Sequence, residues 1–239
     1  MSWGYLNTHE LLEEHLMQMQ DEEEAGELAE CASRACTFFT FTRKPSQDRW
    51  STRVGGLPAW PSAQEWPTCQ ECDEPLAFVA QFDFRNNPSV DFDLLLFHYC
   101  FSCNPWSSDG ASKVTLLRQG ESEELVVEPI VPDDLEDDEP GPCFGVPHEI
   151  DDYESPFCAM GTKIGGFPPE IQPIEQVFDS TGQPMKFLAC VCSIEGTELE
   201  KIPSTPAVGD LIWGDVGCVY FWYSKNKNGE EVCWDLSCY

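Results

Sequence analysis

Two segments of the chain carry the same order of turn and strand signals, and this repetition limits the folds that the chain can adopt. The first segment starts at Thr52 and reads TRVGGLPAWPSAQEWPTCQECDEPLAFVAQFDF, and the second starts at Thr162 and reads TKIGGFPPEIQPIEQVFDSTGQPMKFLACVCSI. Their Gly-Gly-x-Pro elements align, and so do Pro75 and Pro184 further on, with one residue fewer in the second segment. The sequence therefore predicts an internal duplication, with two halves of the same local fold.

The Gly-Gly-x-Pro element of each segment is typical of a turn, because glycine accepts positive φ and proline fixes the bend that follows. A phosphate-binding loop is the functional alternative. Neither segment has the Lys-Ser/Thr pair or the longer glycine spacing of such loops, so we interpret both elements as structural.

Apolar runs follow each turn and predict sheet strands, while one helical pattern precedes them. Asn7 and Glu10 fit a capping box at the start of a helix over residues 8–32, and residues 37–42 predict a strand. The sequence thus predicts an α+β fold with internally duplicated, sheet-rich halves, an N-terminal helix and an inserted zinc ribbon. The expected parts are an N-terminal helical segment at 1–34, a first repeat with the zinc ribbon at 35–130, an acidic linker or loop at 131–156 and a second repeat at 157–239.

Four cysteines of the first segment form two Cys-x-x-Cys pairs, Cys69 with Cys72 and Cys100 with Cys103. The two-residue gap lets one tight turn offer two thiolates to one ion, and four thiolates suit tetrahedral zinc. The chain between the pairs has room for one outgoing and one returning strand, which would bring the pairs together as in a zinc ribbon. Because four sulfurs leave no open position for water, we expect one structural Zn2+ per chain without a Lewis-acid role.

The remaining cysteines and one histidine are weaker candidates for metal ligands. His98 lies beside the second pair and could replace a thiolate, although a packed or surface histidine is the commoner case. Cys190 and Cys192 would share one face of a strand as small core residues. The other pairs that could form a second site are Cys233 with Cys238 and Cys31 with Cys36.

The chain is strongly acidic, with 13 Lys and Arg against 43 Asp and Glu and a formal net charge of -30. Such a surface repels nucleic acid and anionic lipid, so we expect no nucleic-acid or membrane partner and a basic protein as the natural counterpart. The alternative explanation is that the negative charge only keeps the protein soluble. The start, MSWGYLNTHE, lacks the basic and apolar parts of a secretory signal, which favours a cytoplasmic protein with reduced thiols.

No pattern of an enzyme site stands out, so the sequence predicts no catalytic residue and no organic cofactor. The four histidines are scattered, and neither a nucleophile elbow nor a dinucleotide fingerprint is present. The carboxylates occur in runs such as Asp133-Asp134, which fit a solvated loop better than a paired acid and base. An uncharacterised enzyme with a cleft between the two repeats is the alternative class.

The motifs VGGLP…PLAFVAQFDF at residues 54–84 and IGGFP…PMKFLACV at 164–191, with GDLIWGDVGCVYFWY at 209–223, resemble the YwqG-like family of bacterial proteins. That resemblance implies a fold over residues 35–239 and no established enzymatic activity. Residues 55–60 and 75–81, with the two Cys-x-x-Cys pairs, resemble the N-terminal part of the programmed cell death protein 2 family. Members of that family act as chaperones of a basic ribosomal protein, but the C-terminal half of this chain has no further Cys-x-x-Cys pair.

Together these features predict a cytoplasmic, non-enzymatic, acidic zinc-containing module that binds a basic protein. A client-specific chaperone and an immunity-type inhibitor of a basic toxin both fit this prediction, and the sequence does not separate them.

Overall fold

The computed structural model describes residues 8–21, 26–61, 64–103, 109–118, 125–126, 142–194, 211–214 and 216–238. In this part of the chain the named helices are α1 (Thr8–Gln18) and the 3-10 turn η1 (Asp109–Ala111). The strands of the same part are β1 (Ser33–Thr42), β2 (Arg53–Val54), β3 (Trp60–Pro61), β4 (Ala77–Asp83), β5 (Leu94–Tyr99), β6 (Ser112–Leu117), β7 (Leu125–Val126), β8 (Cys143–Tyr153), β9 (Lys163–Gly165), β10 (Lys186–Cys192), β11 (Gly217–Asn226) and β12 (Gly229–Cys238).

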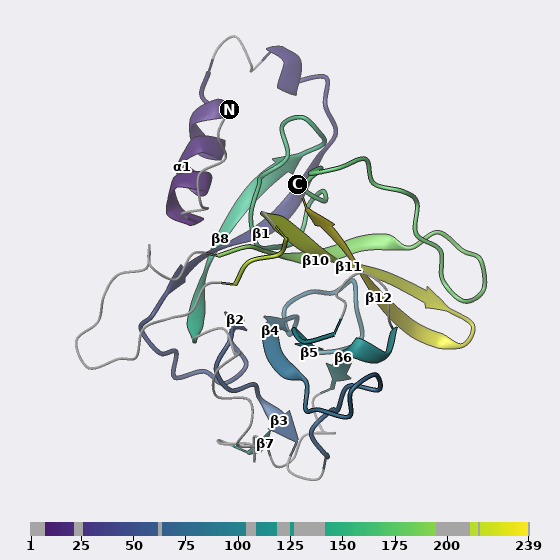
Figure 1. Cartoon of the computed structure of the whole chain (residues 1–239). Helices are drawn as coiled ribbons and strands as arrows, with labels where there is room; N and C mark the ends of the chain where they lie inside the picture. The colour runs from purple at the N-terminus through teal and green to yellow at the C-terminus, as the bar shows by residue number, and fades with distance from the viewer. Residues whose placement is uncertain are drawn as a thin grey trace. The chain divides into compact units, whose positions relative to one another are not determined.

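The chain divides into two compact units. Unit 1 comprises Met1–Phe41, Val146–Leu199 and Asp210–Tyr239, and unit 2 comprises Thr42–Gly145 and Glu200–Gly209. The strands of unit 1 follow the order β12-β11-β10-β9-β1-β8, and those of unit 2 follow the order β8-β2-β4-β5-β6. Figure 1 labels all of these strands except β9. The boundary between the units falls after Gly145, within the residues of β8, and β3 and β7 form a separate pair in unit 2.

The two repeated segments have the same local strand pairing, one in each unit. In unit 2, β2 pairs with β4 and β4 with β5; in unit 1, β9 pairs with β10 and β10 with β11, all antiparallel. The middle strand of each set has an irregularity at the corresponding place, between Phe78 and Ala80 in β4 and between Phe187 and Ala189 in β10. The aligned sequence positions thus adopt matching local structures.

Both Gly-Gly pairs adopt the positive φ that the turn interpretation requires. The angle is 68° at Gly56 and 72° at Gly166, a region that residues with a Cβ rarely enter. A Cβ on Gly56 would also lie 2.8 Å from the Cβ of Pro142, and one on Gly166 would overlap the carboxylate of Asp152. Each turn therefore needs glycine for its conformation and for the close approach of its neighbour.

The expected α+β fold class is wrong, because strands dominate the described residues. Helical structure in that part is confined to α1, a turn at residues 26–28 and η1. The expected helix over 8–32 ends at Gln18, and its buried face consists of Thr8, Leu11, Leu12 and His15. Leu12 is buried whereas Leu16, one helical turn later, is 42% exposed, so apolar spacing alone does not mark the buried face of this helix. Asn7, the expected helix cap, lies outside the described residues.

Strand β1 fulfils the expectation of a strand at 37–42 and starts four residues earlier. Phe38, Thr40 and Phe41 are buried in it, and β1 pairs antiparallel with β9. Residues 143–153, which composition places in the acidic segment, form strand β8, while residues 127–141 of that segment lie outside the described residues.

The central strands of each unit are buried along most of their length. In unit 2 all six residues of β5 and the first six of β4 are buried, and in unit 1 the first eight residues of β11 are buried. The sequences of such strands are mostly apolar, without strict alternation, because both of their faces are covered. In unit 2, the buried strands β4 and β5 are flanked by the two cysteine pairs.

Candidate metal centre

The two Cys-x-x-Cys pairs of unit 2 lie at the same end of one antiparallel strand pair. Cys69 and Cys72 precede β4, and Cys100 and Cys103 follow β5, so the end of one strand and the start of the other place them together. The outgoing and returning strands expected between the pairs are β4 and β5.

Backbone hydrogen bonds fix the turn that holds the first pair. The N–H of Cys69 donates to the carbonyl of Glu74 at 2.7 Å, and the N–H of Asp73 donates to the carbonyl of Cys69 at 2.9 Å. Asp73 has a φ of 63°, which aspartate tolerates better than most residues, and this conformation closes the turn. The sulfurs of this pair are therefore presented by a well-defined loop.

The turn η1 and its flanks tie both cysteine pairs to one short segment. The N–H of Gln70 donates to the carbonyl of Gly110 at 2.9 Å, and the N–H of Cys100 donates to the carbonyl of Ala111 at 2.8 Å. Ala111 also packs in a buried cluster with Cys69, Leu76 and Cys100. This segment holds the two turns in register before any ion is considered.

The four sulfurs form a set with the dimensions of a tetrahedral thiolate site. All four lie within 4.8 Å of one another, and the Sγ–Sγ distance is 3.7 Å both for Cys69 with Cys103 and for Cys72 with Cys100. A metal–sulfur bond of about 2.3 Å in a tetrahedron places sulfurs about 3.8 Å apart. The residues present therefore fit a metal ion, and the group could hold one.

The four thiols differ in exposure, and the pKa values of Cys69, Cys100 and Cys103 are shifted in different directions. Cys69 and Cys100 are buried, Cys103 is half-buried and Cys72 is exposed. Burial acts to raise the pKa of Cys69, but hydrogen bonds from the backbone at Glu71 and Cys72 outweigh it and lower the pKa. Burial raises the pKa of Cys100, and hydrogen bonding to Cys72 raises that of Cys103. Four thiolates in one place thus need a cation to offset their charge.

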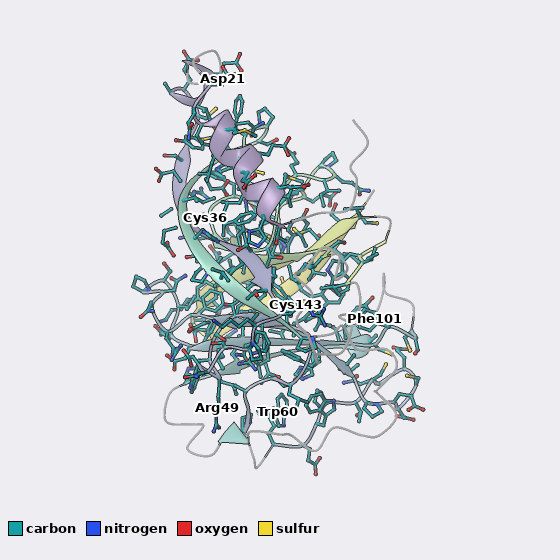
Figure 2. The ribbon with its side chains drawn as sticks, turned by 90° about the vertical axis from the view of Figure 1, so that its left-hand side faces the viewer. Asp21, Cys36, Arg49, Trp60, Phe101 and Cys143 are labelled. Carbon is teal, nitrogen blue, oxygen red and sulfur yellow. A yellow bond between two sulfur atoms is a disulfide. The ribbon has the colours of Figure 1, made fainter. Side chains whose placement is uncertain are left out.

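His98, the alternative ligand, is packed away from this group. Its ring is fully buried, with centroids 5.1 Å from that of Trp60, 5.0 Å from that of Trp66 and 5.5 Å from that of Phe78. Burial lowers the pKa of His98 to about 3, so the ring is neutral. Figure 2 labels Trp60, one of these aromatic neighbours. His98 is a core residue of β5 rather than a member of the sulfur set.

Unit 1 has a hydrogen-bonded carboxylate where unit 2 has the first cysteine turn. The N–H of Asp179 donates to the carbonyl of Gln183 at 2.8 Å, which matches the bond that closes the cysteine turn. Asp179 accepts hydrogen bonds from the hydroxyl of Ser224 and the amide of Asn226, each at 2.9 Å, and from Thr181. Side-chain hydrogen bonds to Asp179 thus stabilise this turn in unit 1, whereas cysteine ligands to a metal ion could stabilise the corresponding turn in unit 2.

A second sulfur group in unit 1 was missed by the sequence analysis. Cys190, Cys192 and Cys218 place their sulfurs within 4.8 Å of one another, and Cys192 and Cys218 form a disulfide. Cys190 and Cys192 were expected to share a face, but only the register of β10 with β11 brings Cys218 opposite Cys192. Among the described cysteines, neither Cys233 with Cys238 nor Cys31 with Cys36 belongs to a group of three or more possible ligands.

The acidic runs Asp133-Asp134 and Glu136 to Glu139 lie outside the described residues. Within the described part of the chain, no helix combines the length and apolar character needed to cross a bilayer.

Residues 52–114 match the model of a protein family described as a domain of unknown function (DUF1963). The match contains β2 to β5, η1 and all four cysteines of the candidate metal centre. No curated protein matches the chain. The similarity to this uncharacterised domain is thus confined to the part of unit 2 that holds the candidate metal centre.

Proposed function

We propose that the chain is a non-enzymatic protein-binding module in which one Zn2+, held by Cys69, Cys72, Cys100 and Cys103, braces unit 2 and an acidic surface engages a basic protein. The spacing of the four sulfurs is the observation that carries the metal, and the net charge of -30 is the observation that carries the partner.

Zinc suits the group because its preferred coordination is tetrahedral and four thiolates satisfy it completely. The ion would join the turn before β4 to the turn after β5, closing the end of that strand pair. With four protein ligands no position is open for water or substrate, so the role of the ion is structural.

Exposed carboxylates in unit 1 support a basic partner. Glu10, Glu13 and Glu14 are exposed on α1, and Glu149 and Asp151 are exposed on β8. Positive charge on a partner would be attracted to such a surface over a distance of about 10 Å at 0.1 M salt. The attraction sets the association rate and the choice of partner more than it sets the affinity.

The proposed biological role is that of a client-specific chaperone or of an immunity-type inhibitor of a basic toxin. We base the chaperone role on the resemblance of residues 55–60 and 75–81, with the two Cys-x-x-Cys pairs, to the programmed cell death protein 2 family. We further propose that the YwqG-like motifs in both segments reflect a duplicated unit that kept its metal ligands in one copy only. The matching irregularities of β4 and β10 support that duplication.

Affinity purification of the tagged full chain from its native host tests the partner, followed by mass spectrometry at about 0.1 M and about 0.5 M salt. We expect a basic protein that is retained at low salt and lost at high salt. A variant with Glu13→Lys and Glu14→Lys should retain less of it, while Cys31→Ser should retain it fully. Recovery of only neutral or acidic proteins, or retention that does not depend on salt, would contradict the proposal.

The identity of the captured protein distinguishes the two proposed roles. A ribosomal protein captured during its synthesis would favour the chaperone, and a toxin encoded by a neighbouring gene would favour the inhibitor.

A further inference from the structure

Three cysteines of unit 1 lie on neighbouring strands in the interior of the unit. Cys190 and Cys192 point to one face of β10, and Cys218 of β11 is the direct partner of Cys192 across the strand pair. All three are buried, and they pack in one apolar cluster with Met185, Tyr220 and Trp222.

The three thiols are not equivalent. Cys192 and Cys218 are linked by a disulfide, with a sequence separation of 26 residues. Cys190 instead donates its S–H to the carbonyl of Gly161 at 3.2 Å, and burial raises its pKa to about 12. Because the thiolate is the attacking species in disulfide exchange, the raised pKa disfavours attack by Cys190 on the neighbouring disulfide.

A metal ion suits this group less well than a disulfide. Three thiolates would carry negative charge into an apolar cluster, where unpaired charge is costly. The cation whose charge acts on Cys190 is Lys163, and Lys163 is already paired with Asp152 at 2.7 Å. Two thiols and one disulfide are both uncharged, so either state suits the same surroundings.

We propose that Cys192 and Cys218 are an oxidation site, two buried thiols under reducing conditions and a β10–β11 cross-link after oxidation by a peroxide. One thiol of the pair is oxidised to a sulfenic acid as hydrogen peroxide is reduced to water. The other thiol then attacks that sulfur, the S–S bond forms and a second molecule of water leaves. Two thiols and one peroxide thus give one disulfide and two waters, and Cys190 stays a thiol.

The consequence of oxidation is that β10 and β11 can no longer separate. Their connecting chain is closed into a covalent loop, which limits the unfolded states available to this part of unit 1. The group differs in this from the cysteines of unit 2, whose partly exposed sulfurs are arranged around a position for an ion.

Peptide mapping of the full, zinc-loaded chain tests the proposal. Trypsin cleaves after Lys186, Lys201 and Lys225, so Cys190 and Cys192 fall in residues 187–201 and Cys218 falls in residues 202–225. After treatment with hydrogen peroxide and blocking of free thiols, we expect these two peptides to be cross-linked, and we expect a reductant to separate them. The cross-link should persist in Cys190→Ser and be absent from Cys192→Ser and Cys218→Ser.

Direct fragmentation of the cross-linked wild-type peptides identifies the bonded sulfurs without any substitution, so poor folding of a variant does not weaken the test. Three results would overturn the proposal. The first is a cross-link that survives in Cys192→Ser, which would make Cys190 the partner, and the second is no cross-link after peroxide treatment. The third is a metal content of two ions per reduced chain with the second lost in Cys192→Ser, which would make the group a metal site.

Discussion

The Nζ of Lys163 lies 2.7 Å from the Oδ2 of Asp152, and both side chains are fully buried in unit 1. Burial acts to lower the pKa of Lys163, but the Asp152 carboxylate outweighs it and raises the pKa, so the lysine is charged. Lys163 also donates to the carbonyl of Ala159, and Asp152 accepts from the N–H groups of Ala159 and Phe167. The pair thereby connects β8 and β9 to the loop before β9 and to the Gly-Gly turn after it.

Removal of one partner of this pair leaves a buried charge without compensation. We expect Lys163→Met to lower the free energy of unfolding by about 3–5 kcal/mol, measured by urea denaturation at pH 7. Arg85→Ala is the matched control, because Arg85 pairs with Asp48 and Asp83 at the surface and its loss should cost within about 1 kcal/mol. Equal losses for the two variants would show that the buried pair has no special structural role.

The conformation of the second Gly-Gly turn predicts a contrast between two glycines of unit 1. Gly166 and Gly182 both have positive φ, at 72° and 78°, so alanine at either should cost about 1–2 kcal/mol. A Cβ on Gly166 also overlaps the Asp152 carboxylate, whereas a Cβ on Gly182 meets nothing within 4 Å. We expect Gly166→Ala to be the more destabilising by at least about 1 kcal/mol in thermal or urea unfolding. A larger loss for Gly182→Ala would contradict this account.

Metal analysis should find about one zinc ion per chain, and Cys69→Ser should reduce it to a small fraction. The buried Cys69 is a good choice for this test because its loss leaves three ligands and opens the set of sulfurs. The chain should also lose thermal stability on treatment with a chelator, since metal binding and folding are coupled. Cys31→Ser in unit 1 is the control and should keep its metal. Full retention of zinc by Cys69→Ser would refute the proposed ligands.

The hydrogen bonds to Asp179 predict a dependence of stability on pH. Hydrogen bonds, with that from Asn226 the largest contribution, hold the pKa of Asp179 below its usual value. A carboxyl whose pKa is lowered by folding stabilises the native state fully above the unfolded pKa of about 3.9, and this contribution is lost as the pH falls through the native pKa. Asp179→Asn should therefore be less stable than the wild type at pH 7, and the difference should shrink below about pH 4. Glu10→Gln on the exposed face of α1 is the control, and a difference that stays constant from pH 7 to pH 3 would contradict the prediction.

The strands and the cysteine pairs were predictable because their signals are local. Each Cys-x-x-Cys pair spans one turn, and the strands β4, β5 and β11 contain mostly apolar residues. The extent of α1 was not predictable from spacing, since Leu12 and Leu16 both fit a helical stripe and only tertiary packing leaves Leu16 exposed.

The group of Cys190, Cys192 and Cys218 could not be predicted from the sequence, because it depends on the register of two paired strands. Cys192 and Cys218 meet only because β10 and β11 pair in one register, and a shift by one residue would turn Cys218 to the other face. The Lys163–Asp152 pair is of the same kind, because a lysine in a short strand is normally expected at the surface.

The position of β1 in the strand order has a consequence for how the protein is made. Unit 2 is almost continuous in the chain, whereas β1 pairs with β9, whose residues are synthesised only after the whole of β2 to β8. At about 5–20 residues per second, the buried side chains Phe38 and Phe41 leave the ribosome many seconds before their strand partners exist. The nascent chain thus exposes an unpaired apolar strand early in translation. The yield of folded protein in the cell should depend on how well this strand is kept from aggregating with other chains until residue 165 has emerged.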